Sequence, residues 1–439
     1  MKTRISVRTG LLVFVLFALA VTTLVAQTQE PEIAIVHVNV IDVIAGTAKP
    51  DMTVVIKGNR ISVVASASSV EPRANAQIVD GKGQFLIPGL WDMHVHLGNA
   101  GPSVLPLLVS YGITGVRDMG SPSFDTIHQW GVEDLAGRRI GPRIIAPGPM
   151  LTMIDPLFWQ WQVHNPEEAR RTVDHLAEMG VDFVKITQTF DRPTYFAIAD
   201  ESLKVGLPLV GHLPVSDDGI GFKVGGVEAS NAGQKCFEHL HGIPFPFEKP
   251  DPLLIPTLLR NGTWVDPTLV TYWTNAHLDD LIPVAKADPR LKYVPPALVH
   301  GQWDPAVGQK RNSDLALKIF QWRMAQAKML NDNHVPLLAG TDMGFPYVYP
   351  GELAKEIELF VEAGLPPADA LRTATINPAR FLDRDKVLGS VESGKFADLV
   401  LLDGNPLDDI HNIERIQSVI LNGRYLIREE LVKTLSTFQ

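Results

Sequence analysis

The stretch Val181-Asp182-Phe183-Val184-Lys185-Ile186 decides the fold: it is a short apolar run that carries a lysine near its end. A similar run, Leu209-Val210-Gly211-His212, places a histidine 27 residues after Lys185, and Phe237-Glu238-His239 places another 27 residues later. Short apolar runs bounded by polar residues are typical of buried parallel strands. The constant spacing leaves room for one helix between strands, so it predicts repeated strand–helix units.

Eight such strands are predicted between Phe85 and Asp342. Asn165 is a typical N-cap and Gly180 a typical helix end, which predicts one of the connecting helices over residues 166–179. Strand–helix alternation at this count predicts an α/β fold, a (β/α)8 barrel of the TIM type over residues 88–386. The predicted strands end near His96, Asp118, Gly148, Ile186, His212, His239, Pro267 and Asp342.

Both ends of the chain have the composition of short β-strands instead of the strand–helix pattern of the middle. Residues 33–38, 53–56 and 61–64 are rich in β-branched side chains, with a predicted hairpin turn at 57–60, and residues 397–402 and 418–421 continue this pattern. The sequence therefore predicts a small β-sandwich domain built from residues 27–87 and 387–439, into which the barrel is inserted.

The first 26 residues are predicted to be a signal peptide. Lys2, Arg4 and Arg8 precede an apolar run that ends at Ala26, which is the pattern of a secretory signal, and an uncleaved anchor helix is the alternative. We therefore expect an exported protein, periplasmic or secreted, without a stable membrane anchor after cleavage. The single cysteine, Cys236, excludes an intramolecular disulfide.

The composition of the chain indicates which kinds of binding partner are expected. The chain of 439 residues is 45% hydrophobic and 20% charged, which is ordinary for a globular protein. The 39 Lys and Arg against 49 Asp and Glu give a net charge of −10 without a basic block, so nucleic-acid binding is not expected.

Polar side chains gather at the predicted strand ends, which meet at one rim of a barrel. His94 and His96 lie two residues apart and point to the same face of a strand, where two imidazoles can bind a metal such as Zn²⁺. The alternative is two histidines hydrogen-bonded to carboxylates. His212 and His239 would hold a second metal, and His241 shares a strand face with His239 as a rival ligand.

Lys185 and Asp342 complete the predicted centre. A buried unpaired ammonium is costly, so either Lys185 forms an ion pair with Asp118 or Asp342, or CO₂ has converted it into a carbamate able to bridge two cations. Asp342 would bind the first metal and accept the proton of a water held between the cations. Its alternative role is that of a helix N-cap.

The chain resembles the amidohydrolase superfamily, in particular the branch of imidazolonepropionase-like and prolidase-like metal-dependent hydrolases. The resemblance runs from about Ile33 to Leu426. The motifs that carry it lie at residues 89–96, 112–118, 184–186, 211–212, 238–239, 340–342 and 394–400.

The resemblance implies a deformed eight-stranded barrel and a binuclear centre of two divalent metal ions, with Zn²⁺ as the expected metal. By carry-over, His94, His96 and Asp342 bind the buried ion, His212 and His239 bind the exposed ion, and carboxylated Lys185 binds both. A lysine at this position argues against the mononuclear members, including imidazolonepropionase itself and the deaminases. It implies hydrolysis of an amide or peptide-like bond in a small molecule or short peptide, such as a dipeptide or N-acyl amino acid.

Two functions stand beside this one: a lactone or ester hydrolase with the same centre, and a metal-binding barrel without activity. One departure from the family concerns Tyr349-Pro350, which stands where many relatives carry a histidine. The resemblance therefore implies no substrate contacts for the loop that contains Tyr349 and Pro350.

Aromatic residues near the predicted rim complete the candidates. Tyr272 could donate a hydrogen bond to the scissile carbonyl, or simply pack in the core. Phe158, Trp159 and Trp161 could wall a substrate pocket or form a contact between copies, so a homo-oligomer stays an open alternative.

Overall fold

The computed structural model describes residues 32–216, 221–244, 251–307 and 312–435. The predicted signal peptide lies outside these residues. Within them, no helix is both long and apolar enough to cross a membrane.

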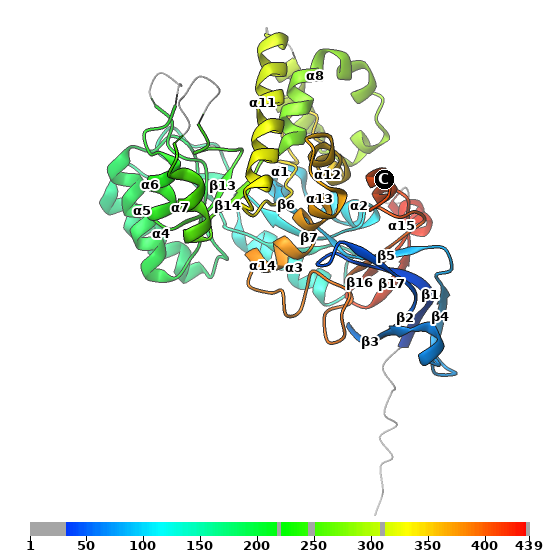
Figure 1. The fold of residues 1–439 in the computed structure, drawn as a ribbon. Helices are drawn as coiled ribbons and strands as arrows, with labels where there is room; N and C mark the ends of the chain where they lie inside the picture. The colour runs from blue at the N-terminus through cyan, green and yellow to red at the C-terminus, as the bar shows by residue number, and fades with distance from the viewer. Residues whose placement is uncertain (1–31, 217–220, 245–250, 308–311, 436–439) are drawn as a thin grey trace, which may run out of the picture.

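The two chain ends meet in one sheet, drawn in blue and red in Figure 1. Its strand order is β17-β16-β15-β5-β1-β2-β3, with β4 paired to β1. The ends are joined where β5 runs antiparallel to β15, with Ile87 opposite Val400. The strands are β1 (Glu32–Asp42), β2 (Thr47–Lys57), β3 (Arg60–Ser66), β4 (Gln77–Asp80), β5 (Phe85–Pro88), β15 (Leu399–Leu402), β16 (Ile416–Leu421) and β17 (Arg424–Ile427).

This end sheet has its own core and a hairpin where one was predicted. Lys57 pairs with Arg60, so Gly58 and Asn59 form a two-residue turn between β2 and β3, and Gly58 has the positive φ of 56° that such turns require. Side chains from both chain ends pack together on one face, among them Ile35 and Leu399. The strands expected at both ends are therefore present, and their hydrogen bonds join them as a single eight-stranded sheet.

The middle of the chain forms two parallel sheets. The first has the order β6-β7-β8 and the second the order β10-β9-β11-β12-β13-β14. Seven of the eight predicted strands are β6, β7, β8, β11, β12, β13 and β14, whereas β9 and β10 were not predicted. Their bounds are β6 (Leu90–Val95), β7 (Ile113–Asp118), β8 (Arg143–Ile145), β9 (Met150–Thr152), β10 (Gln160–Gln162), β11 (Val184–Ile186), β12 (Leu209–Gly211), β13 (Gln234–Glu238) and β14 (Trp264–Asp266).

The eighth predicted strand connects the two sheets instead of forming a long strand of its own. Leu337 bridges to Val265 beside β14, and Met343 bridges to Val95 of β6, both in parallel orientation. On the opposite side, the Asp182 N–H donates to the Ala146 carbonyl at 3.0 Å, which brings the start of β11 close to the end of β8.

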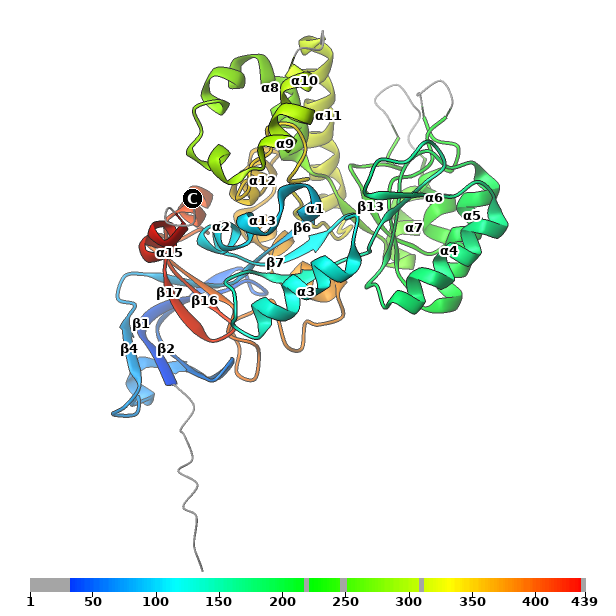
Figure 2. The same ribbon diagram turned by 180° about the vertical axis from the view of Figure 1, so that it is seen from behind.

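Helices surround these strands, and two of them, α2 (Leu105–Ser110) and α15 (Arg428–Leu435), lie beside the end sheet (Figures 1 and 2). The predicted helix is α4 (Pro166–Met179): the Asn165 side chain accepts from the Glu168 N–H, and Gly180 ends the helix with a φ of 76°. The longer helices are α3 (Phe124–Leu135), α5 (Arg192–Val205), α7 (Leu254–Asn261), α8 (Leu269–Ala285), α11 (Ser313–Asp332), α12 (Leu353–Glu362) and α15 (Arg428–Leu435). The shorter ones are α1 (Leu97–Ala100), α2 (Leu105–Ser110), α6 (Gly226–Asn231), α9 (Pro296–Leu298), α10 (Asp304–Val307), α13 (Pro367–Thr373) and α14 (Ile376–Phe381).

Candidate metal centre

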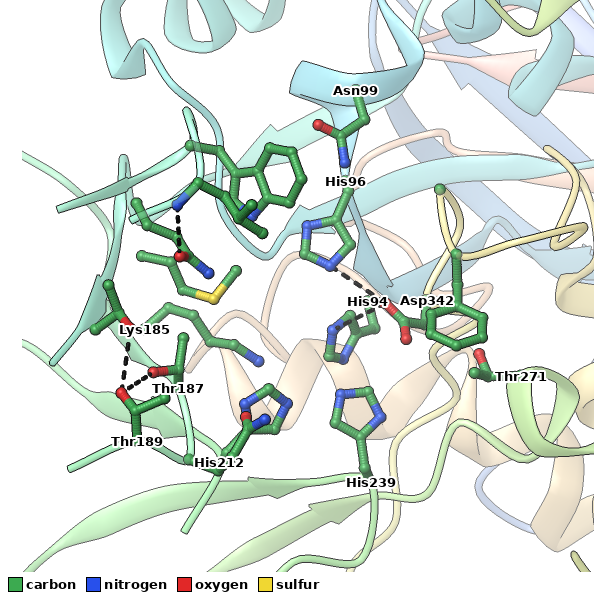
Figure 3. A pocket seen from close by; sticks show the side chains of 18 of the residues that line it. His94, His96, Asn99, Lys185, Thr187, Thr189, His212, His239, Thr271 and Asp342 are labelled. Atoms are coloured by element: carbon green, nitrogen blue, oxygen red, sulfur yellow. Dashed lines mark hydrogen bonds and ion pairs between the residues drawn. The ribbon is translucent and has the colours of Figure 1, made fainter. Parts of the chain in front are cut away.

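The structure brings all six predicted ligands to one cavity of about 780 Å³ (Figure 3). Each lies at or just after the carboxyl end of a parallel strand or of the connecting segment that bridges β14 and β6. The six are His94, His96, Lys185, His212, His239 and Asp342, and all line the cavity.

His94, His96 and Asp342 form the tightest group. The Asp342 Oδ1 lies 3.2 Å from the His96 Nε2 and 3.6 Å from the His94 Nε2. Potential ligand atoms of the three residues all lie within 4.8 Å of one another, which is compact enough to hold one metal ion. The alternative of two histidines paired with carboxylates is not contradicted, because His94 lies beside Glu238 and Asp342, and His96 lies beside Asp342. The His96 Nδ1 is buried without a hydrogen-bond partner in the described part of the chain.

Asp342 is fixed by the backbone rather than by a helix. Its N–H donates to the His94 carbonyl at 2.7 Å, and its φ of 59° lies in the left-handed region. The next helix, α12, begins only at Leu353, so the N-cap alternative for Asp342 is wrong. Behind it, the Asp92 carboxylate accepts hydrogen bonds from the Thr341 N–H and hydroxyl, at 2.9 and 2.7 Å, while burial raises the pKa of Asp92 to about 7.

Lys185 is 1% exposed, and its Nζ has no hydrogen-bond partner among the described residues. The ion-pair alternative is therefore wrong: Asp118 accepts instead from the Leu97 N–H and the Ser121 hydroxyl, at 2.8 and 2.7 Å. Burial lowers the pKa of the Lys185 amine, although the nearby Glu238 opposes this effect. Figure 3 shows the side chain reaching toward the imidazoles of the cavity.

The remaining imidazoles are held in their neutral form. Burial keeps the pKa of His212 and of His239 well below the ordinary value, and the nearby Lys185 amine acts in the same direction on both. Their ring centroids are 4.9 Å apart, and the His239 ring lies 4.7 Å from that of His94. Neutral imidazole is the form that binds metal.

The rival ligand His241 lies in the same cavity. Its ring is also 4.9 Å from that of His212, and burial lowers its pKa to about 3. His239 differs by its contact with the His94 ring and by a hydrogen bond of 2.7 Å between its Nδ1 and the Thr268 hydroxyl. His239 therefore lies between the rings of His94 and His212.

A buried polar layer under the centre was missed in the sequence. Glu238 accepts from Arg117 and lies 3.0 Å from the His94 Nδ1, and Arg117 also reaches Asp266 at 3.3 Å. Burial, reinforced by Glu238, raises the pKa of Asp266 well above its ordinary value. The available signal was that Glu238, Asp266 and Arg117 all stand at the ends of predicted apolar strands.

Tyr272 lines the cavity, and its ring centroid is 6.4 Å from that of His239. The Arg323 guanidinium stacks 3.3 Å from the centre of the Tyr272 ring, and burial raises the pKa of the phenol. The Tyr272 phenol is therefore un-ionised where it lines the cavity.

The aromatic residues that follow β9 lie in different environments. Trp159 lines the cavity, Trp161 stacks on His175 with ring centroids 5.6 Å apart, and Phe158 is 65% exposed. Tyr349 packs edge-on against Trp303, at 5.4 Å between centroids, and is not among the cavity-lining residues.

Residues 85–426 match the family model described as Amidohydrolase family. The chain belongs to this family. It is 24% identical over 425 residues to an adenine deaminase of Clostridium botulinum (strain Loch Maree / Type A3), an alignment that covers 93% of this chain and 60% of the relative. The chain thus spans about three fifths of the length of that curated relative.

Solved structures of similar fold include a candidate prolidase from Bifidobacterium longum, with a TM-score of 0.72, 25% identity and coverage of 93% of this amidohydrolase and 100% of the other chain. A Xaa-Pro dipeptidase with bound methionine has a TM-score of 0.70 at 22% identity, with coverage of 90% and 100%. The bottromycin amidohydrolase has a TM-score of 0.73 at 22% identity, with coverage of 92% and 90%.

The residues at the rim fit the divalent metal that this family uses. Neutral imidazoles, a carboxylate and a buried amine without a partner face one cavity, and such a set of donors is poorly satisfied without a cation.

Proposed function

We propose that this amidohydrolase is a metal-dependent hydrolase that cleaves a carbon–nitrogen bond of a small substrate, an amide of the dipeptide or N-acyl amino acid type. The observation that carries the proposal is the unpartnered Lys185 Nζ, buried among the imidazoles of the rim. A lysine in that place needs either an anion or a change of charge.

A carbamate meets this need. The neutral Nζ forms a bond to the carbon of CO₂ and loses a proton to solvent, so that a cationic side chain becomes an anionic one. The lowered pKa of Lys185 supports the supply of neutral amine. The carbamate would bridge two divalent cations, Zn²⁺ in our proposal, with His94, His96 and Asp342 on the buried ion and His212 and His239 on the exposed ion.

When bound, the cations polarise the scissile carbonyl and lower the pKa of water. Asp342 takes the proton of the attacking water and returns it to the leaving amine, since its carboxylate projects into the cavity beside His94 and His96. Tyr272 donates a hydrogen bond to the carbonyl oxygen as negative charge develops there.

Two further parts of the proposal concern the whole chain. We propose that the two parallel sheets and the segment 337–343 close into one (β/α)8 barrel, supported by the bridges at Val265 and Val95. We also propose that residues 1–26 direct export to the periplasm or the medium, supported by the charged start and apolar run of that segment.

Metal analysis and a substrate panel test the proposal together. Purified protein should hold about two zinc ions per chain, and Lys185→Ala should lose at least one of them and reduce kcat by about 100-fold or more. The panel pairs N-acyl amino acids and dipeptides with lactones. Full turnover by Lys185→Ala would refute the role of the carbamate, and turnover of lactones alone would refute the amide as substrate.

A further inference from the structure

Three ionisable side chains form a buried layer beneath His94. Arg117 from β7, Glu238 from β13 and Asp266 from β14 are each 0% exposed. The Arg117 Nη2 lies 3.0 Å from both Glu238 oxygens and 3.3 Å from the Asp266 Oδ2. The Arg117 Nε donates to the Met93 carbonyl at 2.6 Å, which ties this layer to β6 directly beside His94.

We propose that Glu238 is a positioning residue for His94: it accepts the Nδ1 proton and leaves the Nε2 as the nitrogen that binds the buried metal. This inference rests on the metal centre of the proposed function. The His94 Nδ1 lies 3.0 Å from the Glu238 Oε2, whereas the His94 Nε2 faces Asp342 (Figure 3).

The chemistry of the two groups decides which atom donates. A neutral imidazole carries one proton, and a carboxylate paired with a guanidinium can only accept. The proton therefore resides on the Nδ1, and the lone pair of the Nε2 points to the cavity. A carboxylate in this place also fixes the plane of the ring and raises the basicity of the ligating nitrogen.

The same layer contains a second group of potential ligands, because donor atoms of His94, Glu238 and Asp266 lie within 4.8 Å of one another. The Arg117 guanidinium already contacts both carboxylates and supplies the positive charge there. The layer is therefore built to support a metal ligand rather than to hold a third ion.

His94 differs in this respect from the other histidines of the centre. In the part of the chain that the structure describes, the Nδ1 atoms of His96 and His212 have no hydrogen-bond partner, and that of His239 has the Thr268 hydroxyl. Loss of the Glu238 charge should therefore lower the affinity for the buried ion and leave the affinity for the exposed ion unchanged.

Stepwise zinc titration against a chromophoric chelator tests this inference with the isosteric variant Glu238→Gln. The dissociation constant of one zinc ion should rise by about 10- to 100-fold and that of the other should not change. The matched control is Asp134→Asn, since Asp134 is also a buried carboxylate paired with an arginine, Arg139 at 2.7 Å, and contacts none of the proposed ligands.

The outcomes separate the two proposals. Wild-type protein that binds no zinc would refute the proposed function itself. A wild type with two zinc ions and a Glu238→Gln variant with unchanged constants would refute only the role of Glu238, as would equal losses in both variants.

A measurement on the wild-type protein covers the case in which Glu238→Gln fails to fold. In zinc-loaded protein labelled with ¹⁵N-histidine, with His94 assigned by comparison with His94→Gln, the Nδ1 should carry the proton and the Nε2 should show the shift of a metal ligand. A metal-bound Nδ1 would overturn the inference.

Discussion

At the scale of single residues, Asp342 has the most demanding role. Its left-handed backbone conformation and its hydrogen bond to the His94 carbonyl direct the carboxylate toward His94 and His96. A non-glycine residue in this conformation carries some strain, which is common where a side chain must be aimed at a site.

Asp342→Asn should reduce kcat by about 100- to 10,000-fold, because an amide cannot accept the proton of the attacking water. Steady-state kinetics on the best substrate of the panel would measure this effect, with circular dichroism to verify the fold. Asp134→Asn should retain full activity, and a comparable loss in that control would assign the effect to folding instead.

Asp134, near the end of α3, provides a pH-dependent test of stability. Burial raises its pKa to about 6 from 3.8 despite its pair with Arg139. Between these two pH values the folded state binds a proton that the unfolded state does not, so the free energy of unfolding falls as the pH rises. Asp134→Asn removes this contribution.

Denaturant titrations from pH 4 to pH 6 should measure the free energy of unfolding of Asp134→Asn and of the wild type. The value for the variant minus that for the wild type should increase with pH. A difference that stays constant or decreases over this range would contradict the raised pKa of Asp134.

At the scale of elements, the distance between β11 and β12 depends on Gly211. Its φ is 126°, and a Cβ built on it would lie 2.4 Å from the Ile186 carbonyl oxygen. That same oxygen accepts the His212 N–H at 3.1 Å, so close backbone approach at Gly211 places His212 beside Lys185.

Gly211→Ala should push the two strands apart, with a cost of about 1–3 kcal/mol in the free energy of unfolding and a weaker affinity for the exposed zinc ion. Denaturant titration and zinc titration would measure the two effects. Gly301→Ala is the control, since a Cβ at Gly301 meets nothing within 4 Å. Equal behaviour of the two variants would refute the steric argument.

At the scale of the whole molecule, the end sheet is bound to the parallel strands by specific contacts. The Arg143 Nε of β8 lies 2.6 Å from the Asp398 Oδ2, and the Gly89 N–H, just before β6, donates to the Asp398 carbonyl at 2.7 Å. The strand that contains the candidate ligand His94 therefore begins directly at the end sheet.

Removal of the proposed metal ions should lower the stability of the whole folded chain. Ligands that bind only the folded state stabilise it by about 2.7 kcal/mol at 100 times their dissociation constant. Chelation should therefore lower the midpoint of thermal unfolding by on the order of 5 °C, and added zinc should restore it. In calorimetry, chelation should lower the unfolding midpoint of Lys185→Ala by less than that of the wild type. An equally large decrease in the variant would argue against a bridging lysine.

The sequence by itself determined the strand–helix repeat, seven of the eight predicted strands, the bounds of α4 and the strand ends that carry the candidate ligands. These follow from local periodicity, capping residues and turn residues, which are properties of neighbouring positions. Only the tertiary structure decided which nitrogen of His94 faces Glu238, that Lys185 has no ion-pair partner in the described chain, and that Trp159 rather than Phe158 lines the cavity. These features depend on side chains that meet across strands more than a hundred residues apart, as His94 meets Glu238, and no local pattern encodes such a contact.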